Sequence, residues 1–125
     1  MSRGDALPTF VVRLDHDDVA RYAAASGDHN PIHREPTAAA AAGLPGVVAH
    51  GLLVLAHVLR AVADGAGAGV VREVSARFTR PVAVPAELTV EGAVTSVEPD
   101  GRRVVELLVS AGGRPVARVT AAVAR

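Results

Sequence analysis

Apolar and polar residues alternate along the C-terminal half of the chain, a pattern typical of strands with one buried face. The alternation occupies four segments, at residues 70–78, 87–95, 103–110 and 114–123. In the second segment Leu88, Val90 and Val94 share one face. The connections at 98–101 and 111–113 contain glycine next to aspartate, alanine or a second glycine, and such sequences form tight turns. We therefore expect four antiparallel strands joined largely by hairpins.

The N-terminal half has a mostly helical pattern. A short strand is predicted at 9–14 and a helix at 15–25, with Asp15 as its N-cap and Gly27 at its C-terminal end. Residues 27–36 are rich in turn formers, so this segment is expected to be irregular. A short alanine-rich helix at 37–42 and a longer helix at 51–63 follow, and then a glycine-rich loop at 64–69.

The predicted helix at 51–63 (GLLVLAHVLRAVA) is apolar almost all round. A surface helix has a single apolar stripe, so we expect this helix to be surrounded by protein. A strongly curved antiparallel sheet wrapped around one apolar helix satisfies the whole pattern. That architecture is the α+β hotdog fold, here as a single domain of residues 1–125. The alternative is an ordinary two-layer α+β sandwich, which requires a helix that is apolar on one side only.

Composition narrows the function classes. The chain has 125 residues, half of them hydrophobic, and a formal net charge of zero with no basic cluster, so we do not expect it to bind nucleic acid. It has no cysteine, which excludes thiolate nucleophiles and cysteine-based zinc sites. We see no secretory signal, and the longest apolar stretch, at 51–62, is too short to span a bilayer. A soluble, cytoplasmic protein is expected.

The residues that carry chemistry cluster at 22–33 (YAAASGDHNPIH). This segment resembles the hydratase and dehydratase signature of the MaoC-like family, with Asp28 and His33 at the catalytic positions. His50, Gly51 and Leu52 resemble the family's His-Gly-Met element that opens the central helix, and residues 77–82 resemble a further family strand. The resemblance extends over nearly the whole chain.

The resemblance implies a hydro-lyase that adds water to a 2-enoyl thioester or removes it from an (R)-3-hydroxyacyl thioester. The carboxylate of Asp28 would activate the water, and the imidazole of His33 would shuttle the α-proton. A carboxylate and an imidazole five residues apart across a proline-containing turn can face one pocket and hold one water between them. The sequence does not assign which group holds which proton.

Three further residues are candidates for the site. The backbone N–H of Gly51 lies at the start of a helix, where it has no intrahelical partner, and the missing side chain admits a thioester carbonyl. Gly51 is therefore the expected oxyanion hole. Asn30 can fix the turn through side-chain to backbone bonds. His50 either lines the substrate site or bonds the backbone at the start of the helix.

The expected substrate is an acyl thioester of CoA or of acyl carrier protein, and the expected assembly is a homodimer or, alternatively, a heterodimer. No cofactor is expected, since Asp28, His33 and His50 have no spacing specific for a metal, and 64–69 lacks a nucleotide-binding pattern. Two rival functions stay open. One is a hotdog thioesterase, and the other is a non-catalytic subunit of a hetero-oligomeric dehydratase.

Overall fold

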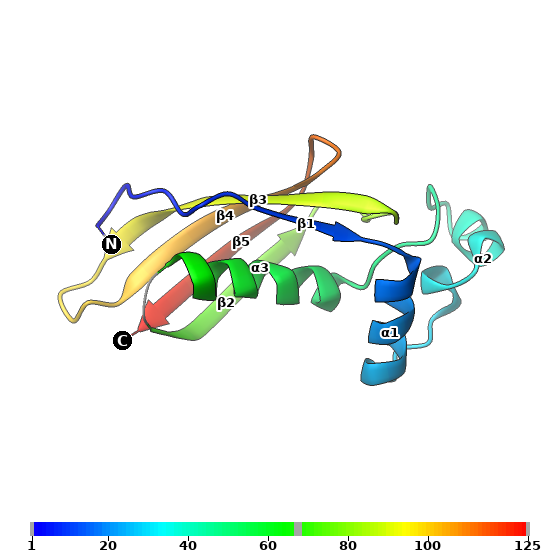
Figure 1. Cartoon of the computed structure of the whole chain (residues 1–125), viewed down its shortest axis with the longest axis horizontal. Coiled ribbons are helices and arrows are strands. Elements are labelled where there is room, and N and C mark those ends of the chain that lie inside the picture. The colour runs from blue at the N-terminus through cyan, green and yellow to red at the C-terminus, as the bar shows by residue number, and fades with distance from the viewer. Residues whose placement is uncertain (1, 67–68, 125) are drawn as a thin grey trace.

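The computed structural model describes residues 2–66 and 69–124. These residues form a five-stranded sheet, three α-helices and one short 3-10 helix (Figure 1). Along the chain the elements are β1 (Phe10–Leu14), α1 (His16–Ser26), η1 (Pro31–His33), α2 (Pro36–Ala41), α3 (Gly51–Gly65), β2 (Val70–Phe78), β3 (Ala86–Val97), β4 (Arg103–Ala111) and β5 (Arg114–Ala124). Each predicted element is present, with its ends shifted by at most two residues.

The sheet is antiparallel throughout and has the strand order β1-β3-β4-β5-β2. Two hairpins connect β3 to β4 and β4 to β5, as the turn residues predicted. In the second hairpin Gly112 and Gly113 both have positive φ angles, of 58° and 78°, which glycine adopts without strain. β2 returns to the far edge beside β5, so β1 and β2 are the two edge strands.

The core lies between the sheet and one side of α3. Alternate residues of the central strands point toward the helix and are buried, as the two-residue period predicted; they include Leu88, Val90, Val94, Val105 and Val109. Register shifts in the β2–β5, β3–β4 and β4–β5 pairs add local twist, which helps the sheet to curve around the helix. The result is the expected hotdog arrangement of an α+β protein (Figure 1).

The environment of α3 differs from the expectation that protein surrounds it. Leu53, Val54 and Val58 are buried, but Leu52 is 68% exposed and Ala56 is also exposed. The reason is geometric, because a sheet covers a helix from one side only. Within one chain, therefore, the helix has an uncovered apolar side. None of the helices in the described part of the chain is long and apolar enough to cross a membrane.

The C-terminal end of α3 also differs from the prediction. The helix continues through Asp64 and Gly65, which the sequence assigned to a loop, and Asp64 lies one turn after its ion-pair partner Arg60 at 3.7 Å. The buried guanidinium of Arg103 on β4 donates a hydrogen bond to the carbonyl of Ala66, just past the helix, where a cation is favoured by the helix dipole. The middle of the predicted loop, at residues 67–68, lies outside the described residues.

Candidate active site

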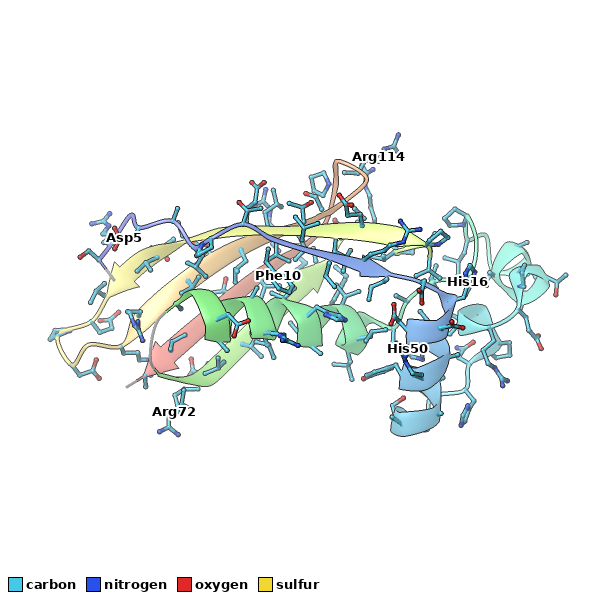
Figure 2. The ribbon with its side chains drawn as sticks, viewed as in Figure 1. Asp5, Phe10, His16, His50, Arg72 and Arg114 are labelled. Atoms are coloured by element: carbon cyan, nitrogen blue, oxygen red, sulfur yellow. The ribbon has the colours of Figure 1, made fainter. Side chains whose placement is uncertain are left out.

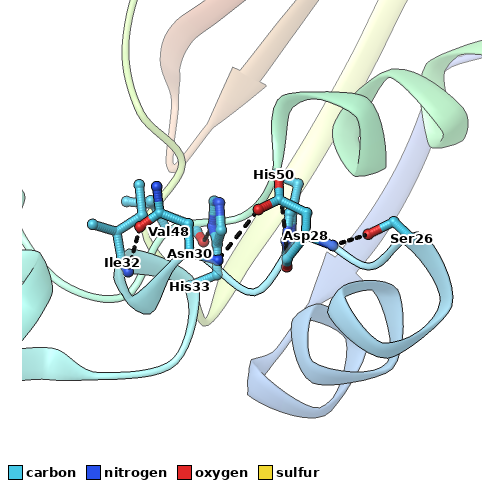
Figure 3. Close-up of polar contacts among 7 residues, drawn as sticks. All are labelled: Ser26, Asp28, Asn30, Ile32, His33, Val48 and His50. Carbon is cyan, nitrogen blue, oxygen red and sulfur yellow. Dashed lines mark hydrogen bonds and ion pairs between the residues drawn. The ribbon is translucent and has the colours of Figure 1, made fainter.

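The turn between α1 and α2 is built by three side chains at alternate positions. The hydroxyl of Ser26 accepts from the N–H of Asp28 at 3.2 Å, and Asp28 Oδ1 accepts from the N–H of Asn30 at 3.3 Å. Asn30 Oδ1 in turn accepts from the N–H of Ile32 at 3.2 Å. Each bond spans two residues, so the spacing of Ser, Asp and Asn in the signature has a direct structural use. Figure 3 shows Ser26, Asp28 and Asn30 along the turn.

The two carboxylate oxygens of Asp28 therefore differ in role, since one is bonded within the turn and the other is available to a ligand. Its Oδ1 holds the turn, while its Oδ2 lies 4.0 Å from Nε2 of His50. The side chain is 53% exposed, so solvent and a ligand can reach the carboxylate. The expected role of Asn30 in fixing the turn is confirmed, since its side chain accepts from Ile32 and caps η1.

His33 is held in one orientation by the main chain. Its Nδ1 lies 2.6 Å from the carbonyl oxygen of Val48, in the segment that leads into α3. A carbonyl oxygen only accepts hydrogen bonds, so Nδ1 of His33 carries a proton. In the neutral ring Nε2 is then unprotonated and remains for exchange with a ligand. The sequence did not reveal this contact, because Val48 is an ordinary apolar residue 15 positions away.

His50 is the residue immediately before α3 (Figure 2). It is buried, with 3% of its surface exposed. Its side chain makes no capping bond to α3. Instead its Nε2 lies 3.2 Å from the main-chain carbonyl oxygen of Asp28 (Figure 3). Its ring is stacked on that of His33, with centroids 3.6 Å apart and planes inclined by 19°.

Tyr22 of α1 belongs to the same cluster. Its ring lies against His50, with centroids 4.8 Å apart and an interplanar angle of 57°. Tyr22, His50 and His33 form a row of three neighbouring rings that runs from α1 to η1, and Tyr22 is the aromatic residue at which the MaoC-like signature begins.

Gly51 lies at the point where the site meets α3. A pocket of about 250 Å³ is lined by Tyr22, Ser26, Asp28, His33, His50, Gly51 and Leu52. The N–H of Gly51 has no backbone acceptor among the described residues, as expected for the first residue of a helix. A second pocket of about 370 Å³, lined in part by Val54 and Phe78, shares Gly51 with the first.

The cluster has the residue types of a metal site but not a suitable geometry. Atoms of metal-ligating type on Asp28, His33 and His50 all lie within 4.8 Å of one another. The two imidazoles are nearly parallel, so the lone pairs in their planes run side by side and do not converge on one ion. One nitrogen of each ring also contacts a main-chain carbonyl. The arrangement suits proton exchange better than metal coordination.

A family model for the MaoC-like domain matches residues 6–112 of the chain. The chain belongs to this family. The match spans the MaoC-like signature, the start of α3 and most of the sheet, which are the parts that position the site.

Two of the curated relatives of this MaoC-like domain are dehydratases from Mycobacterium tuberculosis. The 3-hydroxyacyl-thioester dehydratase X is 44% identical over 79 residues, covering 63% of this chain and 28% of the relative. The 3-hydroxyacyl-thioester dehydratase Y is 36% identical over 132 aligned positions, covering 94% of this chain and 44% of the relative. The chain thus spans less than half the length of either protein.

Among solved structures, the MaoC-like domain is similar to an (R)-hydratase from Pseudomonas aeruginosa in its unliganded form. The two are 28% identical, with a TM-score of 0.89, and the alignment covers 98% of this chain and 81% of the other. This likeness agrees with the hotdog fold described above.

Proposed function

We propose that this MaoC-like domain is a hydro-lyase that adds water to a 2-enoyl thioester and removes it from an (R)-3-hydroxyacyl thioester. The observation that carries the proposal is the meeting of Asp28 and His33 with the free N–H of Gly51 in one pocket. The family membership and the names of the relatives support the reaction class. We take residues 1–125 as one domain, and we expect the enzyme to act in the cytoplasm.

The Oδ2 atom of Asp28 and the Nε2 atom of His33, which the turn and Val48 leave available, suggest how the reaction proceeds. Asp28 Oδ2 takes a proton from water as the water oxygen bonds to C3 of the enoyl chain. Nε2 of His33, when it carries a proton, delivers that proton to C2, while its Nδ1 stays bonded to the carbonyl of Val48. The thioester oxygen gains negative charge in between and accepts from the N–H of Gly51. Proton exchange between Asp28 and His33 then resets the pair, and dehydration reverses each step.

The adjoining 370 Å³ pocket is our candidate for the acyl chain. It shares Gly51 with the catalytic pocket, and Val54, Phe78 and Pro81 give it an apolar wall. A chain in this pocket would place its thioester beside the N–H of Gly51. The carrier is CoA or acyl carrier protein.

A single assay tests the reaction. The purified protein is expected to bleach the ultraviolet absorbance of a short trans-2-enoyl-CoA and to form the (R)-3-hydroxyacyl product. Asp28→Asn and His33→Gln are each expected to lower kcat by roughly a hundredfold or more, because each removes a group that transfers a proton. Circular dichroism of both variants should match that of the wild type.

Matched controls are available within the same chain. Asp17→Asn and His29→Gln make the same chemical changes on exposed residues outside the pocket and should keep the wild-type rate. Release of free thiol from the substrate would indicate the thioesterase instead. Activity that appears only after a second chain is added would indicate the hetero-oligomeric subunit.

We also propose that the protein acts as a dimer. β2 is an edge strand whose residues are almost all exposed, and Val70, Val74 and Phe78 on it are 53%, 41% and 41% exposed. The uncovered side of α3 adds Leu52 to this apolar surface. An unpaired strand edge of this kind favours pairing with another chain, and a second copy is the simplest partner.

A further inference from the structure

Capping of α3 does not explain why His50 is buried. It precedes α3 and has the extended backbone of an N-cap residue, but its ring makes no hydrogen bond to the helix. His50 is nevertheless buried, with only 3% of its surface exposed, and its ring contacts two residues of the signature turn, Asp28 and His33. Its contacts therefore point toward the catalytic pair.

The hydrogen bond to Asp28 fixes the proton on His50. Nε2 lies 3.2 Å from the main-chain carbonyl of Asp28, which can only accept, so Nε2 must be the protonated nitrogen. The same nitrogen is 4.0 Å from the Asp28 carboxylate, too far for a hydrogen bond. His50 thus holds the backbone of Asp28 and leaves the Oδ2 atom of the carboxylate free.

The other nitrogen of His50 favours a neutral ring. Nδ1 is buried and has no hydrogen-bond partner among the described residues. An unprotonated Nδ1 costs little free energy in this buried position, whereas a protonated Nδ1 would be a buried donor without an acceptor. The titratable groups that face His50 are Tyr22 of α1, Asp28 of the turn and His33 of η1.

Stacking allows His50 to orient the His33 ring as well. Its ring covers one face of His33 at 3.6 Å, while Tyr22 packs on His50 at 4.8 Å. The carbonyl of Val48 fixes His33 within its ring plane. Together a bond in the plane and a ring on the face leave His33 one orientation, with Nε2 as its free nitrogen.

We propose that His50 is a positioning residue for the Asp28–His33 pair, acting as a neutral imidazole protonated on Nε2. It sets the Asp28 main chain through a hydrogen bond and the His33 ring through stacking, and it transfers no proton itself. The inference deepens the proposed hydro-lyase function and rests on it for the kinetic readout. The position of the proton is testable without any substrate.

Two variants separate the two contacts. His50→Phe keeps a ring for stacking and loses the donor, and His50→Gln keeps a donor and loses the ring. Each is expected to lower kcat by about tenfold to a hundredfold and to leave KM within about threefold, as is usual for residues that orient a catalytic group. The shape of the pH profile of kcat should be retained in His50→Phe. His16→Phe and His16→Gln, on an exposed histidine of α1, are the matched controls.

Long-range ¹H–¹⁵N spectra of the histidine rings give the second readout. In the wild type at neutral pH, His50 should appear as the Nε2–H tautomer and His33 as the Nδ1–H tautomer. In His50→Gln, His33 should populate both tautomers, and in His50→Phe it should keep one. If the wild type hydrates no enoyl thioester, the proposed function fails while these spectra still decide the protonation of His50.

Three results would overturn the inference. The first is a wild-type His50 that is protonated on Nδ1 at neutral pH. The second is a wild-type kcat in both variants. The third is a loss in His50→Phe as large as that in Asp28→Asn together with a missing limb of the pH profile, which would make His50 a proton-transfer group.

Discussion

At the scale of single residues, the chemistry of the site depends on which side-chain atoms are already used in hydrogen bonds to the main chain. Asp28 uses Oδ1 to hold the turn and keeps Oδ2 open, and His33 uses Nδ1 on Val48 and keeps Nε2 open. A residue in this position is at once structural and reactive. For this reason the isosteric Asp28→Asn is a cleaner test than alanine, since the amide oxygen can still accept from Asn30.

Gly51→Ala is expected to separate activity from stability. A Cβ at Gly51 would lie 3.5 Å from the Phe78 ring, an ordinary contact, and Gly51 has no positive φ angle. The free energy of unfolding should therefore stay within about 1 kcal/mol of the wild type. The methyl group would enter the space beside the N–H that we assign to the oxyanion, so kcat/KM should fall by roughly tenfold or more.

Chemical denaturation and the enoyl-CoA assay measure the two quantities. Gly46→Ala, at another glycine without a positive φ angle and with open space around its Cβ, is the control for the substitution itself. An unchanged kcat/KM in Gly51→Ala would remove Gly51 from the mechanism.

At the scale of elements, α1 begins with a reciprocal cap that the sequence predicted only in part. Asp15 accepts from the N–H of Asp18, as the N-cap assignment implied, and Asp18 accepts in return from the N–H of Asp15. The backbone N–H of Asp15 holds the pKa of Asp18 below its ordinary value of 3.8, and Arg21 at 2.6 Å also lowers it, against the opposing effect of burial. The cap fixes where α1 starts and thus where Tyr22 faces.

Asp15→Ala should destabilise the protein by about 1 kcal/mol, because the first turn loses an acceptor. Asp17→Ala, in the same turn but without a capping bond, should lower the stability less.

The stabilising effect of Asp18 should depend on pH. Since folding lowers the pKa of Asp18, this effect is present above pH 3.8 and lost as the pH falls through the folded value. Urea denaturation of wild type and Asp18→Asn should show stabilities that converge on acidification. A constant difference would contradict the assignment.

At the scale of the whole molecule, the sheet and α3 leave one apolar surface uncovered, along β2 and the outer side of the helix. Val74→Asp places a charge in this surface, where it would be buried in a dimer without a partner. The variant is expected to sediment as single chains, whereas the wild type is expected to sediment as dimers. Val11→Asp makes the same change on an exposed residue of β1, at the opposite edge of the sheet, and should keep the wild-type state.

Sedimentation velocity at micromolar concentration distinguishes the outcomes. A wild type that sediments as single chains would contradict the homodimer. If single chains then associate with a second, related chain, the heterodimer is the correct assembly.

The sequence by itself determined the features that depend on near neighbours. The two-residue period predicted the strands, and the Asp100-Gly101 and Gly112-Gly113 pairs predicted the hairpins. The signature predicted the Asp28 turn, because each of its bonds spans only two residues. The tertiary structure decided the features that join distant segments: the carbonyl of Val48 on His33, the bond from His50 to Asp28 across 22 positions, and the side of α3 that the sheet covers. These depend on how α3 packs against the turn and the sheet, and periodicity within one segment carries no information about that packing.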